Sequence, residues 1–370
     1  MNFIDLNLQY KRIKNEIDSA IKSVIDKGDF IQGGKVKLLE EELENFVGSR
    51  CVTCSDGTDA LFVALRALNV KPGDEVIVPS FTWVSTAEVV KLVGAEPIFA
   101  DINADSFNVT LEHIEPKITK KTKAIIPVSM FGRACDILEI TNYANKKGIY
   151  VIEDSAQAFG SKNKGKMSCS VADISTTSFF PAKPLGCYGD GGAIFTNNED
   201  LYTKINAITK HGQKGRYNYV EIGLNSRLDT LQASILIEKL KIYEDEIALR
   251  NKIAKKYDSF LSKNSFLKTP VITDQNNRSV WAQYTILLDS RISDERSRIM
   301  KDLKERGIPT ALYYPAPLHL QGPYMKEGNE VLKITENISK RVLSLPMHPY
   351  LTTEQIEQIS SELIDVVEKY

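Results

Sequence analysis

The sequence predicts an α/β protein, with a large domain built on a mostly parallel sheet and a smaller C-terminal α/β domain. Between residues 75 and 196, short β-rich apolar runs alternate with segments of helical periodicity. This alternation is typical of a parallel sheet with helices on both faces. The predicted strands cover residues 76–78, 97–100, 124–128, 150–152, 174–177 and 193–196. We expect the large domain to span residues 1–240 and the small domain residues 241–370.

The composition is that of an ordinary soluble globular protein, with 42% hydrophobic and 26% charged residues. A formal net charge of −1 without a basic block does not suggest a nucleic-acid partner. No apolar run reaches the length of a membrane span, and the first residues do not resemble a signal peptide, so a cytoplasmic location is expected. Five scattered cysteines indicate reduced thiols. Cys51 and Cys54 have no second pair for zinc and are interpreted as packing residues, and no metal site is predicted.

The first region is predicted to form two amphipathic helices, over residues 8–27 and 35–47, because apolar residues recur there at helical spacing. A glycine-bracketed loop that contains Phe30 and Ile31 separates them. Taken alone, this loop is as well explained by a plain connection between helices as by a functional segment.

The next helix is predicted over residues 59–68, directly after Ser55, Asp56, Gly57 and Thr58. Serine, aspartate and threonine are favoured N-caps. The free N–H groups and the positive dipole end of such a helix also suit a phosphate group. Most capped helices bind nothing, so this pattern by itself is a weak signal.

Three residues of distinctive chemistry each follow a predicted strand: Trp83, Asp154 and Ser178. Ligands of such sheets bind outside the carboxyl ends of the strands. Singly, Trp83 could be a core residue, Asp154 could cap a helix and Ser178 could lie in a turn. Their joint position at three strand ends favours a binding site.

A lysine in unusual surroundings follows Ser178. Lys183 lies between Pro181 and Pro184, and a glycine-rich stretch comes after it at residues 186–192. Neither a helix nor a strand suits this composition, so a rigid loop inside the protein is expected. Removal from water lowers the pKa of a lysine and makes its amine a nucleophile toward carbonyl groups.

The remaining chain is predicted to continue the large domain and then to form the small one. Residues 160–168 approximate a phosphate loop, but Met167 stands where a hydroxyl residue is needed, so an exposed hairpin is predicted instead. The other predicted elements are a helix to about residue 211, a polar aromatic loop at 212–219, a long helix at 228–261, a strand at 283–288, helices at 295–306 and 353–368, and a loop at 313–319.

Several of these motifs together resemble one family. The blocks are residues 55–61, 79–83, 153–157, 178–192 and 225–229, and they occur in family order. They resemble the DegT/DnrJ/EryC1/StrS sugar aminotransferases, which use pyridoxal phosphate (PLP), and the resemblance covers essentially the whole chain. It implies an aspartate-aminotransferase-like fold, known as fold type I, with a seven-stranded sheet. It also implies that pyridoxamine phosphate forms during the reaction.

The resemblance also implies roles for individual residues. Lys183 is the catalytic residue that forms the Schiff base with the cofactor. Asp154 pairs with the pyridine nitrogen, Trp83 stacks on the ring, and Gln157 packs on the other face or donates to the ring hydroxyl. The full implied cofactor set is Gly57, Thr58, Trp83, Asp154, Gln157, Ser178, Lys183 and Asn225. The implied substrate set is Arg227, Tyr313, Tyr314, Phe30 and Ile31.

The family resemblance further implies a homodimer with shared active sites. Asn225 matches a residue that reaches the cofactor phosphate of the neighbouring subunit. Arg227 matches a residue that grips a substrate carboxylate, for which a planar guanidinium is well suited. A helix-start asparagine and a surface arginine are the alternative interpretations.

The segments 176–192 and 211–229 are most similar to one subgroup. Its members transfer an amino group from L-glutamate to the C3 keto group of a UDP-linked N-acetyl hexuronic acid, for bacterial surface polysaccharide. The subgroup has His-Tyr where this chain has Tyr313-Tyr314. A C3 or C4 aminotransferase acting on a dTDP- or UDP-linked keto-deoxy sugar is therefore the alternative.

Two other functional classes fit the sequence less well. Dehydratases of the family carry histidine in place of the lysine, so Lys183 argues against them. A regulatory protein without enzymatic activity is disfavoured by the near-neutral charge and by the complete set of site residues.

Overall fold

A seven-stranded sheet forms the centre of the large domain in the computed structural model, which describes residues 1–271, 276–325 and 330–370. The strand order is β1-β9-β8-β5-β4-β2-β3. The strands are β1 (Arg50–Cys54), β2 (Glu75–Pro79), β3 (Glu96–Ala100), β4 (Thr122–Ile125), β5 (Tyr150–Asp154), β8 (Ile174–Ser178) and β9 (Gly192–Thr196). Strands β3, β2, β4, β5 and β8 pair in parallel, whereas β9 is antiparallel to both β8 and β1. The predicted, mostly parallel sheet is confirmed.

Strand β1 was not predicted as a strand. It forms the sheet edge, pairs only with β9, and contains Cys51 and Cys54. Both cysteines are buried free thiols, as are Cys135, Cys169 and Cys187, so their interpretation as packing residues is confirmed.

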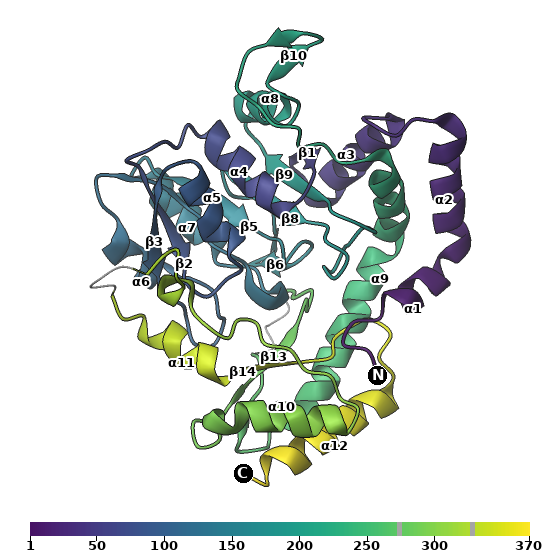
Figure 1. Cartoon of the computed structure of the whole chain (residues 1–370), viewed down its shortest axis with the longest axis vertical. Coiled ribbons are helices and arrows are strands. Elements are labelled where there is room, and N and C mark those ends of the chain that lie inside the picture. The colour runs from purple at the N-terminus through teal and green to yellow at the C-terminus, as the bar shows by residue number, and fades with distance from the viewer. Residues whose placement is uncertain (272–275, 326–329) are drawn as a thin grey trace.

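Helices cover both faces of the sheet (Figure 1). Alternate residues of β2 belong to different cores: Val76 and Val78 pack on one side, and Ile77 packs on the other. The first side is covered by α4 (Gly57–Ala67), α5 (Ser85–Leu92) and α8 (Glu199–Ile208), and the second by α6 (Leu111–Ile114) and α7 (Ile137–Asn145). Short 3-10 helices are η1 (Glu115–Lys117), η2 (Met130–Gly132), η3 (Ser293–Glu295) and η4 (Leu318–Leu320).

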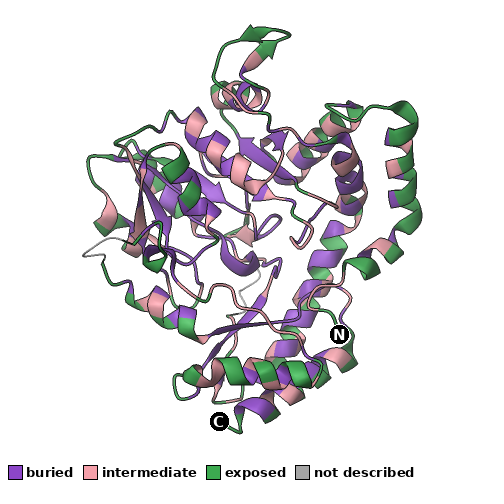
Figure 2. Cartoon of the chain, in the orientation of Figure 1, coloured by how far each residue is buried: buried purple, intermediate pink, exposed green. Residues whose placement is uncertain are grey.

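The N-terminal helices pack on one long helix. The helix predicted over residues 8–27 is divided at Ile13 into α1 (Leu6–Arg12) and α2 (Lys14–Lys27), and α3 (Gly34–Val47) follows. Ile13 departs from helical geometry with φ −126° and ψ 32°. Both α2 and α3 pack against α9 (Thr230–Leu261), and their outer faces are exposed (Figure 2). The sequence pattern did not reveal this break, because Ile13 is itself buried and so continues the apolar spacing of the helix.

The C-terminal region forms a second core around a three-stranded antiparallel sheet. Its elements are β12 (Leu267–Lys268), β13 (Tyr284–Leu288), β14 (Val342–Leu345), α10 (Arg296–Glu305), α11 (Lys333–Arg341) and α12 (Thr353–Val367). Helix α9 runs without a break from the large domain into this core, through the predicted boundary between residues 240 and 241. That boundary stays a prediction.

Two hairpins extend from the large domain. Strands β6 (Lys162–Asn163) and β7 (Lys166–Met167) form the hairpin predicted at residues 160–168. The loop predicted at residues 212–219 is wrong: β10 (Gln213–Gly215) and β11 (Asn218–Tyr219) pair there. This second hairpin projects from the body of the molecule at the top of Figure 1. Across the described ranges, no helix is both long and apolar enough to cross a membrane.

Candidate active site

The loop that carries Lys183 connects β8 to β9 and is closed by its own backbone. The amide of Lys183 donates to the carbonyl of Phe180 at 2.8 Å, and the amide of Cys187 donates to the carbonyl of Phe179 at 2.8 Å. Gly186 allows this closure, because a Cβ there would lie 2.6 Å from the carbonyl oxygens of both Phe180 and Pro181. The loop lies outside regular structure, as expected, and Lys183 itself is partly buried.

The electrostatics around Lys183 favour a neutral amine. Burial lowers the pKa of Lys183, and the charge of Asp154 opposes this effect only in part. Burial likewise raises the pKa of Asp154, although the Ala156 amide, Lys183 and Thr86 all stabilise its ionised form. A lysine with a lowered pKa holds a larger share of the nucleophilic free amine near neutral pH. This direction agrees with the prediction from the sequence.

Asp154 is held in place by two hydrogen bonds at the carboxyl end of β5. Its Oδ1 accepts from the Ala156 amide at 3.1 Å, and its Oδ2 accepts from the Thr86 hydroxyl at 3.1 Å. No helix follows directly, so Asp154 does not cap one. Thr86 was missed by sequence reasoning. The available signal was a hydroxyl residue three positions after Trp83, in the first turn of α5.

Four predicted residues from three distant segments lie together near Asp154. The Gln157 side chain donates through Nε2 to the hydroxyl of Tyr314 at 3.1 Å. The ring of Tyr314 lies 6.2 Å from the ring of Trp83, measured between centroids, and Trp83 is 59% exposed. The Tyr313 ring lies 6.0 Å from that of Tyr314. These residues come from the segments after β2 and β5 and from the C-terminal region, and the Trp83 ring stays largely exposed beside them.

The opposite end of the site is formed by α4 and β8. Gly57 is needed for their close approach, because a Cβ there would lie 2.8 Å from the Cβ of Ser178. The Ser178 Oγ accepts from the Phe180 amide at 3.2 Å, which leaves its proton free to donate. The Thr58 hydroxyl bonds with the Ser85 hydroxyl at 2.7 Å.

The start of α4 differs from the prediction. The helix begins at Gly57 rather than at residue 59, and the carboxylate of Asp56 accepts from the amides of Thr58 at 2.8 Å and Asp59 at 2.9 Å. These two amides are therefore already satisfied. The Ser178 hydroxyl keeps a free donor here, and the Thr58 hydroxyl can donate to a phosphate when Ser85 is the donor in their shared hydrogen bond.

The chemistry of these groups fits PLP. A partly neutral lysine suits its aldehyde, a buried carboxylate suits its pyridine nitrogen, an exposed indole suits its ring, and two hydroxyls suit its phosphate. The sequence profile of the DegT/DnrJ/EryC1/StrS aminotransferase family matches residues 11–364. The chain belongs to this family. It is a PLP-dependent transaminase of the fold type I class.

The aminotransferase is similar to characterised relatives over its full length. It is 50% identical to UDP-2-acetamido-2-deoxy-3-oxo-D-glucuronate aminotransferase of Pseudomonas aeruginosa, over 98% of this chain and 99% of the relative. A family member from Brucella abortus has a solved structure with a TM-score of 0.91 and 41% identity, covering 100% of this chain and 99% of that one. The structure of NtdA from Bacillus subtilis with bound pyridoxamine phosphate has a TM-score of 0.90 and 32% identity, and the match covers 99% of this chain and 83% of that one.

The other predicted residues of the aminotransferase lie apart from this cluster. Phe30 and Ile31 are exposed beside the start of α9, where the Phe30 carbonyl accepts from the Thr230 amide at 3.0 Å. Asn225 is exposed, and Arg227 is partly exposed. Within the described ranges, the guanidinium of Arg227 forms no hydrogen bond or ion pair, and no hydrogen bond or ion pair joins any of these four side chains to Lys183 or Asp154.

A buried carboxylate directly before Asp154 was also missed by sequence reasoning. Glu153 is fully buried, and its carboxylate accepts from the Ser155 hydroxyl at 2.7 Å, the Cys169 amide at 2.9 Å and the Ser175 hydroxyl at 3.2 Å. Burial raises its pKa in spite of these donors. The network joins β5, β8 and the segment between them, and so supports the strand end that presents Asp154.

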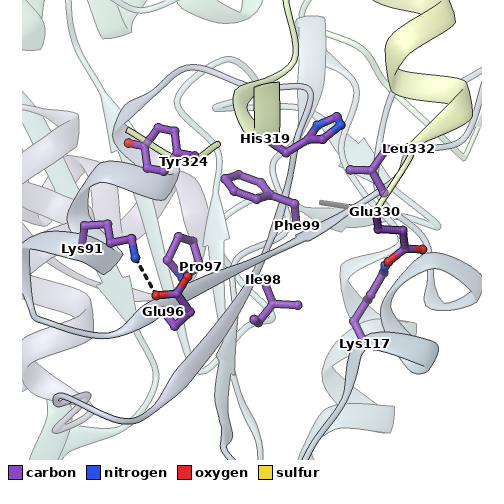
Figure 3. A pocket seen from close by; sticks show the side chains of 10 residues that line it. All are labelled: Lys91, Glu96, Pro97, Ile98, Phe99, Lys117, His319, Tyr324, Glu330 and Leu332. Atoms are coloured by element: carbon purple, nitrogen blue, oxygen red, sulfur yellow. Dashed lines mark hydrogen bonds and ion pairs between the residues drawn. The ribbon is translucent and has the colours of Figure 1, made fainter. Parts of the chain in front are cut away.

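A separate hollow lies beside the edge strand β3 (Figure 3). Its cavity volume is about 190 Å³, and Phe99 and Tyr324 meet edge to face in its wall at 5.6 Å between centroids. Lys91 pairs with Glu96 at 2.5 Å, and Lys117 pairs with Glu330. No predicted site residue is among the described residues that line it. The cluster around Lys183 remains the candidate active site.

Proposed function

We propose that this enzyme transfers an amino group from L-glutamate to the C3 keto group of a UDP-linked N-acetyl-3-oxo-hexuronic acid. The observation that carries the proposal is the 50% identity to the Pseudomonas aeruginosa enzyme, whose name specifies such a substrate. The product would serve the synthesis of diacetamido uronic acids for bacterial surface polysaccharide, such as the O-antigen of lipopolysaccharide. We place the reaction in the cytoplasm.

Lys183 is the proposed catalytic residue. PLP, when bound, supplies an electron sink that stabilises negative charge on the carbon next to nitrogen. The Lys183 amine would hold the cofactor through its aldehyde, and once free it would accept and return the proton of the substrate carbon. The lowered pKa of this amine supports the role, because proton transfer needs a free amine near neutral pH.

The neighbouring residues orient the cofactor in this proposal. Asp154 would pair with the pyridine nitrogen and keep it protonated, and Thr86 and the Ala156 amide fix the carboxylate for this role. Trp83 stacks on the ring. Gln157 lies against the ring, with its amide already engaged by Tyr314 and by the Phe131 amide at 3.0 Å. The proposed ligands of the cofactor phosphate are Gly57, Thr58, Ser178 and Asn225.

Arg227 is the proposed ligand of the substrate carboxylate. A guanidinium binds a carboxylate through two parallel hydrogen bonds, and the side chain of Arg227 has no such partner among the described residues. Tyr313 and Tyr314 are assigned to the sugar, together with Phe30 and Ile31.

A homodimer with shared active sites is part of the proposal. Asn225 and Arg227 lie just after the β10–β11 hairpin. The hairpin and the segment that follows it carry exposed apolar side chains at Tyr217, Tyr219 and Ile222. Ile222 is 81% exposed. An isolated chain would gain no stability from these side chains, whereas a second copy could cover them. We propose that the hairpin and the segment after it reach the Lys183 cluster of the partner.

A mixing experiment tests the shared site. Lys183→Ala and Arg227→Ala enzymes should each be inactive toward the uronic acid substrate, because each dimer lacks one essential group in both sites. Subunit exchange should then restore up to about a quarter of wild-type activity, since half of the dimers are mixed and each holds one intact site. A mixture that stays inactive although mass spectrometry detects mixed dimers would contradict shared sites.

The substrate is tested by running the reaction backwards. PLP-loaded enzyme is mixed with UDP-linked 3-amino uronic acid or with a dTDP-linked 4-amino deoxy sugar, and the visible band of bound PLP is followed. We expect only the uronic acid to convert PLP to pyridoxamine phosphate, with a preference of at least about 100-fold. If only the 4-amino sugar reacts, the alternative substrate class is correct. Tyr313→His, which restores the subgroup pattern, is then the variant to measure next.

A further inference from the structure

A buried lysine that the reaction does not use lies beneath the Lys183 loop. Lys239, in α9, is 1% exposed. Burial of a lysine is unfavourable unless other groups compensate for the lost water. The groups that surround this amine therefore indicate what its charge stabilises.

The partners of Lys239 both belong to the loop that carries Lys183. Its Nζ donates to the carbonyl of Gly186 at 2.6 Å and lies 4.1 Å from the centroid of the Tyr188 ring. A cation over an aromatic face is attracted more strongly when both are removed from water. Within the described residues, Lys239 forms no ion pair with a carboxylate. The contacts of the Lys239 ammonium group are therefore with the Lys183 loop.

Gly186 and Lys183 belong to one tight turn, so a shift of the Gly186 backbone also displaces the backbone of Lys183. The Lys183 amide donates to the Phe180 carbonyl at 2.8 Å, and the Gly186 backbone packs against that same carbonyl. Helix α9 contacts the loop at a second point, where the Tyr188 amide donates to Gln232 Oε1 at 2.9 Å. Gln232 and Lys239 are two helical turns apart and therefore lie on one face of α9.

We propose that Lys239 is a positioning residue for Lys183: its ammonium group fixes the Gly186 end of the loop and thereby the direction of the Lys183 amine. The proposal rests on the proposed role of Lys183. Misplacement of a reacting group by about 1 Å costs about 100-fold in rate. A loop held only by its own backbone would allow such displacement, and the Lys239 and Gln232 contacts restrict it.

The charge on Lys239 is present near neutral pH. Burial lowers its pKa to about 8, while Cys187 and Glu246 favour the charged form. Tyr188, on the other side of the ammonium, is itself surrounded by Tyr10, Asp18 and Glu246, and burial raises its pKa to about 12. The Tyr188 ring therefore faces the ammonium as a neutral phenol.

The test replaces Lys239 with methionine, which has similar length but no charge and no donor. In the PLP-loaded enzyme we expect kcat to fall about 10- to 100-fold, while KM for the sugar changes by less than about threefold. In cofactor-free protein, the rate at which added PLP becomes fixed by borohydride at Lys183 should fall about tenfold. If Lys239→Met does not fold, Lys239→Gln is measured in the same way.

Two variants on the same helix serve as controls. Lys241→Met removes an exposed lysine whose partner is Glu238, and it should match wild type. Tyr257→Phe removes a buried donor to the Pro346 carbonyl (2.9 Å), far along α9 from the loop, and so measures the effect of lost stability alone. Equal losses of kcat and attachment rate in Tyr257→Phe and Lys239→Met would overturn the proposal, as would a rise in KM at unchanged kcat. If wild-type enzyme is not labelled at Lys183 at all, the assignment of Lys183 itself fails.

Discussion

Lys183→Ala enzyme is expected to bind PLP without becoming linked to it and to lose at least about 1,000-fold in transamination rate. The variant removes the only amine that the structure places on the closed loop between β8 and β9, where burial lowers the pKa of Lys183. Borohydride treatment followed by peptide mapping checks the linkage. Wild-type enzyme should carry the reduced cofactor on the peptide that contains Lys183, and the variant should carry none.

Lys164→Ala is the matched control, because Lys164 lies at the exposed tip of the β6–β7 hairpin. It should retain both the label and the activity. Lys183→Arg keeps a positive charge at this position but removes the nucleophilic amine, since a guanidinium stays protonated. A labelled Lys183→Ala enzyme, with the cofactor fixed on another lysine, would refute the assignment.

Asp154→Asn is expected to lower the transamination rate without lowering the thermal stability of the protein. The rate should fall about 100- to 1,000-fold, because a neutral amide no longer keeps the pyridine nitrogen protonated. The cofactor-free protein should melt at the same temperature as wild type or higher. Asparagine can keep the hydrogen bonds with Thr86 and with the Ala156 amide, which are 3.1 Å long in the wild-type protein.

The sign of the stability effect follows from the pKa of Asp154. Burial raises this pKa above that of the unfolded chain, so the native state binds the proton more readily than the unfolded state does. The free energy of unfolding therefore falls as the pH rises through the native pKa, and above that pKa the cofactor-free enzyme carries an unfavourable buried charge. Protonated PLP compensates that charge when it binds. PLP should thus raise the melting temperature of wild type more than that of Asp154→Asn.

Asp173→Asn is the control for this comparison. Burial raises the pKa of Asp173 as well, but its carboxylate accepts from the Val151 amide at 2.8 Å, at the start of β5 and away from the site. Its rate and its response to PLP should match wild type. Melting curves between about pH 5 and pH 8, with and without PLP, decide the matter. An equal PLP-dependent rise in Asp154→Asn and wild type would mean that Asp154 does not face the pyridine nitrogen.

Much of the fold could be predicted because local patterns and long-range packing agree. The strand runs before Trp83 and Asp154 are apolar on both faces, as is typical of strands covered by helices on both sides. The strand before Ser178 is equally buried but consists mainly of serine and threonine. Lys183 was found through its proline and glycine neighbours, which exclude regular structure. Strand β1 was missed because its five residues depend on pairing with β9, which is more than 130 residues away in sequence. The hairpin at β10 and β11 was missed because its exposed faces show no apolar alternation.

The site was harder to predict where it depends on contacts between distant segments. Thr86 and Lys239 have no sequence motif of their own, and their relevance appears only in what they touch. Glu153 stands in the block 153–157, but its supporting role appears only in its buried hydrogen bonds. The contact of Gln157 with Tyr314 joins residues 157 positions apart. The domain boundary raised a different difficulty, since α9 is continuous there and the sequence pattern marks no break.

The packing of the N-terminal helices on α9 has a consequence for synthesis on the ribosome. Ile17 of α2 and Leu39 of α3 bury their side chains against Ile235, Leu236 and Tyr243, which are translated roughly 200 residues later. At about 5 to 20 residues per second, these helices emerge some 10 to 40 seconds before the surface that covers them exists. During that interval their apolar faces are open to other nascent chains. A chaperone that holds the first 50 residues would protect them until α9 arrives.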